Sequence, residues 1–83
     1  MVAFIIICRS ITYAQRLQKM LSQAGFQGVV RRIPAISPGD GCGYGVRLPS
    51  NKMREVLNHL KTTDYTPQRI VCETEKGKLE ECS

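Results

Sequence analysis

Apolar residues form four short runs along the chain, and two segments with helical spacing lie between them. The first run, residues 2–8 (VAFIIIC), is continuous and rich in β-branched residues, as in a strand covered on at least one face. Residues 26–36, 44–48 and 67–73 predict three further strands. Pro34 has no N–H donor, so the strand that contains it is expected at an edge of the sheet.

The two intervening segments predict amphipathic helices. Ser10 is expected to cap a helix that runs to about Ala24, with Gly25 just beyond its end. A second helix is expected to open at Pro49, with Ser50 as its N-cap. The predicted apolar positions are Tyr13, Ala14, Leu17, Met20, Leu21 and Ala24 on the first helix, and Met53, Val56, Leu57 and Leu60 on the second.

The element order strand-helix-strand-strand-helix-strand predicts an α+β fold. With short connections and right-handed crossovers, this order gives a ferredoxin-like sandwich: a four-stranded antiparallel sheet in the order 4-1-3-2, with two helices on one face. Residues 1–73 are expected to form this single domain, and residues 74–83 a flexible polar tail. Both faces of the first strand are apolar, so we expect a homodimer to cover the open face of the sheet.

The same topology brings several polar residues to one end of the sheet, which we call the rim. The first strand ends there at Cys8, and Arg9 and Ser10 lead into the first helix. The loop between the second and third strands, which contains Cys42, is expected at the same end, and so is the start of the fourth strand near Tyr65. Connectivity alone therefore predicts that Cys8 and Cys42 share the rim.

Size and charge narrow the classes of function. The chain has 83 residues, which suits one small domain and favours a carrier or binding module over an enzyme, although the sequence does not decide between them. Its net charge of +5 favours anionic partners. Nucleic-acid binding is disfavoured, because the aromatic motif of an RNA-recognition sheet is missing. The first apolar run is too short to span a membrane and no targeting signal is present, so a cytoplasmic protein is expected.

The most unusual segment is residues 39–45 (GDGCGYG), in which four of seven residues are glycine. Glycines leave the thiol of Cys42 uncrowded, and the backbone N–H groups of Gly41 and Gly43 could hold an anion beside it. If the first helix directs its N-terminus at Cys42, the helix dipole favours the thiolate, which is the nucleophilic form. The alternative is a tight hairpin in which the cysteine has only a structural role.

Other residues of the rim could support this chemistry. Arg9, Ser10 and Arg32 are candidates for binding an anion next to Cys42. Cys8 is either a resolving thiol for Cys42 or a small core residue at the end of a strand. No CxxC pair is present, so a ribbon-type zinc site is not expected, and the proposed chemistry requires no metal or organic cofactor.

The chain resembles a family of small bacterial proteins of unknown function described as selenium/sulfur carrier-like. The resemblance covers residues 3–73 and is carried by FIIICRSITYAQRLQKMLSQAG, RRIPAIS and CGYGVRLP. Cys42 and Gly43 match the Cys-Gly pair of the family, and Ser10 matches its hydroxyl residue. The chain departs from the family pattern at Thr12, Gln18 and Ala35, where many members have a histidine, an acid and an arginine.

The resemblance implies a carrier that accepts a sulfur or selenium atom on Cys42 and passes it to a partner enzyme. A second hypothesis is a non-catalytic ligand-sensing or protein-interaction module, which would use the open face of the sheet. Fold alone does not choose between them.

Overall fold

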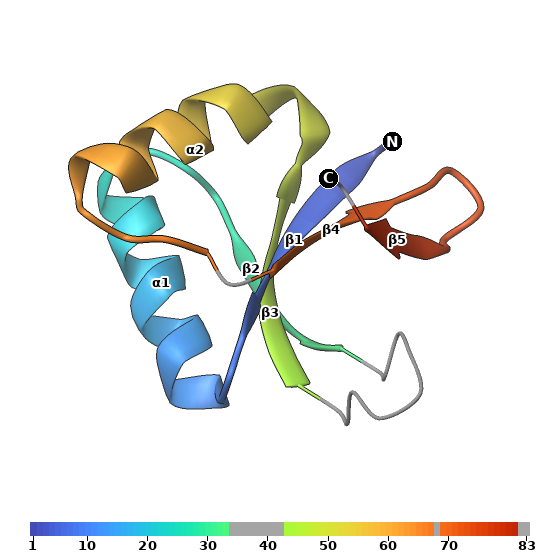
Figure 1. Cartoon of the computed structure of the whole chain (residues 1–83), viewed down its shortest axis with the longest axis horizontal. Coiled ribbons are helices and arrows are strands. Elements are labelled where there is room, and N and C mark those ends of the chain that lie inside the picture. Colours follow the sequence, from blue (N-terminus) through green and yellow to red (C-terminus); the bar gives the residue numbers. More distant parts are fainter. Residues whose placement is uncertain (34–42, 68, 82–83) are drawn as a thin grey trace.

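The computed structural model describes residues 1–33, 43–67 and 69–81. These residues form two helices packed on a five-stranded antiparallel sheet (Figure 1). The strands are β1 (Ala3–Cys8), β2 (Val29–Ile33), β3 (Gly43–Pro49), β4 (Arg69–Glu73) and β5 (Leu79–Glu81). The helices are α1 (Ile11–Gln23) and α2 (Met53–Thr62), and a 3-10 turn over Ser50–Lys52 precedes α2. Neither helix is long and apolar enough to span a membrane, a finding limited to the described ranges.

The sheet has the order β2-β3-β1-β4-β5. β1 lies at its centre, paired with β3 on one side and β4 on the other, and β2 lies at an edge, as predicted. The α+β class and the two helices are confirmed. The prediction of four strands is wrong, because β5 adds a fifth beside β4. The ferredoxin-like description stays a prediction.

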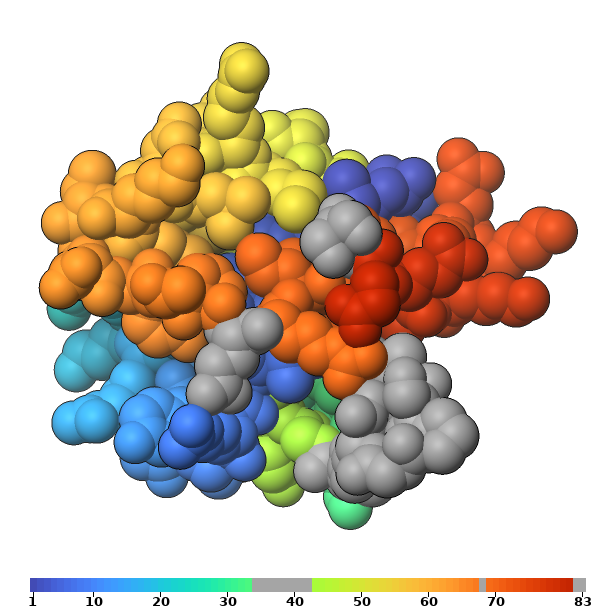
Figure 2. Space-filling view, viewed as in Figure 1, coloured from blue at the N-terminus to red at the C-terminus, as the bar shows by residue number. Residues whose placement is uncertain are grey.

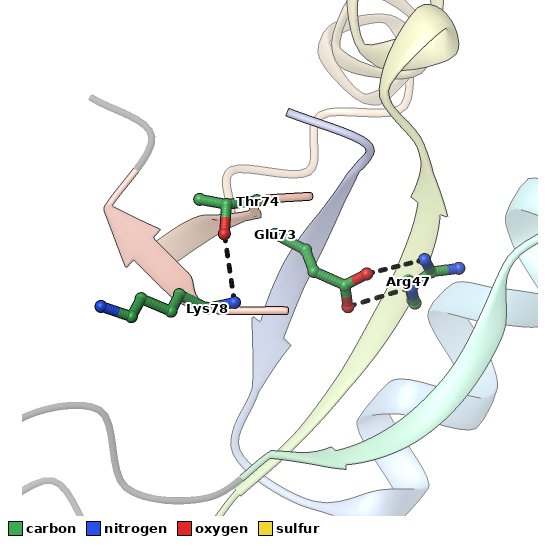
Figure 3. A network of polar contacts seen from close by, with 4 residues as sticks. All are labelled: Arg47, Glu73, Thr74 and Lys78. Carbon is green, nitrogen blue, oxygen red and sulfur yellow. Dashed lines mark hydrogen bonds and ion pairs between the residues drawn. The ribbon is translucent and has the colours of Figure 1, made fainter. Parts of the chain in front are cut away.

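β5 belongs to the segment that was expected to be a flexible tail. A tight turn joins it to β4: Gly77 takes a φ of 82°, and the Thr74 hydroxyl accepts a hydrogen bond from the Lys78 backbone N–H at 3.2 Å (Figure 3). Leu79 then packs against the apolar side chains of the sheet. Residues 74–81, expected to belong to the flexible tail, therefore hold a turn and the short strand β5, and the division into a domain over residues 1–73 and a tail stays a prediction.

The face of the sheet that the helices cover holds the larger core. Phe4 and Ile6 of β1 are fully buried there. Figure 1 shows α1 and α2 on the same side of the sheet. Their buried residues, with those of β3, complete this cluster: Ala14, Leu17, Leu21, Val46, Leu48, Val56 and Leu60. The helical spacing in the sequence identified most of this core, although Tyr13 and Ala24 are exposed.

The opposite face carries a smaller apolar cluster of Ile5, Ile33 and Val71, each at most 4% exposed in the single chain. Arg47 and Glu73 lie beside it and form a two-pronged ion pair, with Nη2–Oε2 at 2.8 Å and Nε–Oε1 at 3.3 Å (Figure 3). The homodimer was expected because this face would be bare. These three residues are buried within one chain, and the homodimer stays a prediction.

The two helices begin differently. The Ser10 hydroxyl accepts a hydrogen bond from the Tyr13 backbone N–H, which confirms Ser10 as the N-cap of α1. Gly25 follows α1 with a φ of 93°, the left-handed conformation expected after a helix end. Ser50 is not the N-cap of α2. It opens the 3-10 turn instead, and Lys52 precedes α2 without a side-chain cap.

Candidate functional site

The rim forms where β1 ends and α1 begins, at the lower end of the sheet in Figure 1. The antiparallel register places Cys8 opposite Tyr44 on β3, and Tyr44 opposite Arg32 on β2. At the same end of the sheet, Gly43 is opposite Ile33. The end of β2 and the start of β3 therefore lie beside the end of β1, as connectivity predicted.

Cys42 and Gly41 lie outside the described residues. Gly43 is described, and it is joined to Cys42 by one peptide bond. A Cβ built on Gly43 would lie 3.5 Å from the carbonyl oxygen of Cys8, so the start of β3 is in direct contact with the end of β1.

Cys8 points into the helix-covered core and is 6% exposed. Its thiol donates a weak hydrogen bond to the carbonyl oxygen of Ile6, with Sγ–O at 3.7 Å. Burial raises the pKa of the Cys8 thiol, and a hydrogen bond with the hydroxyl of Tyr65 lowers it by less. Cys8 is therefore a protonated, shielded thiol at neutral pH, which agrees with its interpretation as a core residue.

The pKa of Tyr65 is raised as well, first by burial and then by the neighbouring Cys8. Tyr65 packs against the main core, in the short segment between α2 and β4. Its phenol therefore stays protonated at neutral pH and keeps an O–H donor beside the thiol of Cys8.

The three side chains predicted to bind an anion at the rim have different surroundings. Arg9 and Arg32 are both exposed, Arg9 directly after β1 and Arg32 on the edge strand β2. Ser10 is half-buried, and its hydroxyl oxygen accepts the capping bond from the Tyr13 backbone N–H. Arg9 is therefore better placed beside the start of α1 than Arg32, which lies two strands away from Cys8 in the register.

Arg9 also lines a pocket of about 210 Å³ at the rim, together with Ile7, Tyr13, Tyr65 and Thr66. Sequence analysis placed Tyr65 at the rim but did not identify Tyr13 or Thr66 as site residues. Tyr13 was assigned to the apolar stripe of α1, yet it is 54% exposed. Its place in the first turn of α1, close in sequence to Arg9, is the signal that could have identified it.

The other described cysteine lies far from the rim. Cys72 is opposite Phe4, near the start of β1, and it is disulfide-bonded. Within the described part of the chain, no three histidine, cysteine or acidic side chains gather as a metal site would require.

A family model described as putative Se/S carrier protein-like matches residues 3–72 of the chain. No curated protein and no solved structure matches the chain.

Proposed function

Because the chain belongs to this family of putative Se/S carrier-like proteins, we propose that it is a small carrier whose Cys42 thiol accepts a sulfur or selenium atom and delivers it to a partner enzyme. The observation that supports this best is the position of Gly43, which lies against the end of β1 at the rim. The residue that precedes it in the chain is the family's cysteine.

Transfer from a protein persulfide needs no external oxidant. The Cys42 thiolate attacks the outer sulfur of a donor persulfide, a new S–S bond forms at Cys42, and the S–S bond of the donor breaks. The donor leaves as a thiolate, and the transferred sulfur keeps the proton of the persulfide. In the second step a thiolate of the partner enzyme attacks the outer sulfur on Cys42, and Cys42 returns to the thiolate. Selenium would follow the same path.

The charges at the rim suit a carrier of this kind. Both the thiolate and the persulfide that has lost its proton are anions, and α1 begins within three residues of Cys8. The partial positive charge of a helix N-terminus acts mainly within its first turn, so it would stabilise an anion held at this end of the sheet. Arg9 adds a full positive charge at the same place, since it lines the pocket there.

Cys8 has a different role in this proposal from that of Cys42. Its burial and raised pKa keep it protonated, so it does not compete for the incoming sulfur while the protein is folded. A resolving role for Cys8 would require its thiol to leave the core and lose its contacts with the helices. We therefore assign the carrier step to Cys42 alone.

Sulfur uptake by the reduced full-length chain tests the proposal. After incubation with inorganic polysulfide or a persulfidated donor protein and removal of the excess, intact mass would count the sulfur atoms gained. Cys42→Ser is expected to lose the transferable sulfur atom, and Cys8→Ser, Cys72→Ser and Cys82→Ser, which each remove one other thiol, are expected to keep it. Circular dichroism would confirm that Cys42→Ser is folded. If Cys42→Ser takes up and delivers sulfur as the wild type does, the proposal is wrong.

A further inference from the structure

The described residues that line the rim pocket come from three separate segments. Ile7 and Arg9 come from the end of β1, Tyr13 from the first turn of α1, and Tyr65 with Thr66 from the chain between α2 and β4. In Figure 2 the blue start of α1 and the orange segment before β4 lie on the same face of the molecule. The pocket is therefore a product of the fold and not of a single loop.

The polar groups that line the pocket suit an anion. Arg9 contributes a guanidinium, and Tyr13 and Thr66 contribute hydroxyl groups that can donate hydrogen bonds, whereas the Tyr65 hydroxyl is hydrogen-bonded with the thiol of Cys8. None of the lining residues that the structure describes is acidic. A guanidinium has five N–H donors, so Arg9 can bind an oxyanion while making another contact. Its planar fork matches the two oxygens of a sulfonate or phosphate group.

The volume of the pocket suits a small ligand. At about 30 Å³ per water molecule, 210 Å³ holds roughly seven waters. That is enough for a tetrahedral oxyanion with one terminal sulfur atom and some remaining water. Ile7 supplies an apolar surface against which a polarisable sulfur could lie.

We propose that this pocket binds the oxyanion end of a small sulfane-sulfur donor of the thiosulfate class. The inference rests on the proposed function, and it names the donor. The Cys42 thiolate would attack the terminal sulfur of thiosulfate, forming an S–S bond at Cys42. The bond between the two sulfur atoms of thiosulfate would break, and sulfite would leave with the electron pair. The products are a persulfide anion on Cys42 and free sulfite, so atoms and charge balance without another reactant.

Direct binding tests the pocket independently of sulfur transfer. Thiosulfate would be titrated into the full-length Cys42→Ser chain, which cannot react at that position, and followed by calorimetry or by NMR shifts of Arg9, Tyr13 and Thr66. Arg9→Gln removes a charged hydrogen-bond donor from the pocket. We therefore expect it to weaken thiosulfate binding by about tenfold or more. Arg54→Gln removes the same charge from an exposed position on α2 and is expected to change binding by less than twofold.

The hydroxyl groups are tested in the same titration. Tyr13→Phe and Thr66→Val are each expected to weaken thiosulfate binding by several-fold, roughly the effect of one neutral hydrogen bond. Phosphate and sulfate serve as competitors. Equal weakening by Arg9→Gln and Arg54→Gln would show a general charge effect, and tighter binding of phosphate than of thiosulfate would show a different ligand class. Either result overturns the inference.

Sulfur uptake separates this inference from the proposed function. Arg9→Gln is expected to slow loading from thiosulfate at least tenfold more than it slows loading from polysulfide. Loss of the Arg9 charge affects the Cys42 thiolate in both reactions, but only thiosulfate has an oxyanion group for the pocket to bind. If polysulfide loads Cys42 and thiosulfate does not, the donor assignment is wrong and the carrier proposal stands. If neither loads Cys42, the carrier proposal fails, and the donor role of the pocket fails with it.

Discussion

The two faces of the sheet bury neighbouring residues of β1 in different ways. Phe4 and Ile6 face two amphipathic helices and are fully buried in an apolar cluster. Ile5 faces the other way and joins the small cluster with Ile33 and Val71. This second cluster is bordered by charged pairs between strands, Arg47 with Glu73 and Arg69 with Glu81.

This difference indicates separate contributions to stability. The helix-covered face removes more apolar surface from water, so it should supply most of the free energy of folding. The other face combines a few apolar contacts with ion pairs that depend on the pairing of strands. Half-exposed ion pairs contribute little to stability. Arg69 and Glu81 lie on the adjacent strands β4 and β5, where opposite charges favour the correct register, whereas Arg47 and Glu73 pair across β1 and join β3 to β4. Three substitutions test this comparison in decreasing order of expected effect.

Phe4→Ala should have the largest effect, since it leaves a cavity in the helix-covered core. We expect a loss of about 3–5 kcal/mol in the free energy of unfolding, measured by urea denaturation. Ile5→Ala, one residue away on the other face, is expected to lose less, near the lower end of about 2–5 kcal/mol. If Phe4→Ala does not fold, Phe4→Leu allows the same comparison of the two faces with a smaller loss in the free energy of unfolding. A larger loss for Ile5→Ala would reverse our ranking of the two faces.

Gly45→Ala should have an intermediate effect on the opposite face. An added Cβ would lie 2.5 Å from Cγ2 of Ile5 and 3.0 Å from the carbonyl oxygen of Ile6. The buried isoleucine has little room to move, so we expect a loss of about 1–3 kcal/mol in urea denaturation. Ile5→Leu removes Cγ2, and the double variant should therefore lose less than the sum of the single variants. Strict additivity would show that this contact is not the cause.

Glu73→Gln should have the smallest effect, about 0.5–1 kcal/mol at neutral pH and less at high salt. The hydrogen bond from Arg47 lowers the pKa of the Glu73 carboxyl in the folded protein. A lowered folded pKa stabilises the protein above the unfolded value of about 4.3, and this stability is lost as the pH falls through the folded value. Urea denaturation below pH 5 should therefore show a weaker acid dependence for Glu73→Gln than for the wild type.

Glu80→Gln provides the control for Glu73→Gln. Glu80 lies on the neighbouring strand β5 and is exposed, so the substitution removes the same net charge without breaking the pair with Arg47. If both variants lose the same stability and show the same acid dependence, the effect comes from net charge and the Arg47–Glu73 pair contributes nothing specific.

The strands and helices that were predicted correctly have strong patterns in their local sequence. The continuous apolar run of β1, the helical spacing of α1 and the pair formed by Ser10 and Gly25 each specify an element within a few neighbouring residues. The errors have physical causes. Ser50 has the chemistry of an N-cap, but the chain after Pro49 first forms a 3-10 turn. The β5 segment has a single apolar residue, Leu79, and no alternation that could reveal a strand.

Sequence by itself determined the α+β class, both helices, the central place of β1 and the convergence of Cys8, Arg9 and Ser10 at the rim. These follow from hydrophobic spacing, capping chemistry and chain connectivity, all of which are readable along the chain. Only the tertiary structure decided that Cys8 is buried beside Tyr65 and that Tyr13 and Thr66 share a pocket with Arg9. It also decided that β5 joins the sheet. Cys8 and Arg9 meet Tyr65 and Thr66 through packing between segments distant in sequence, which no local pattern encodes, and β5 depends on hydrogen bonding to β4 across the turn.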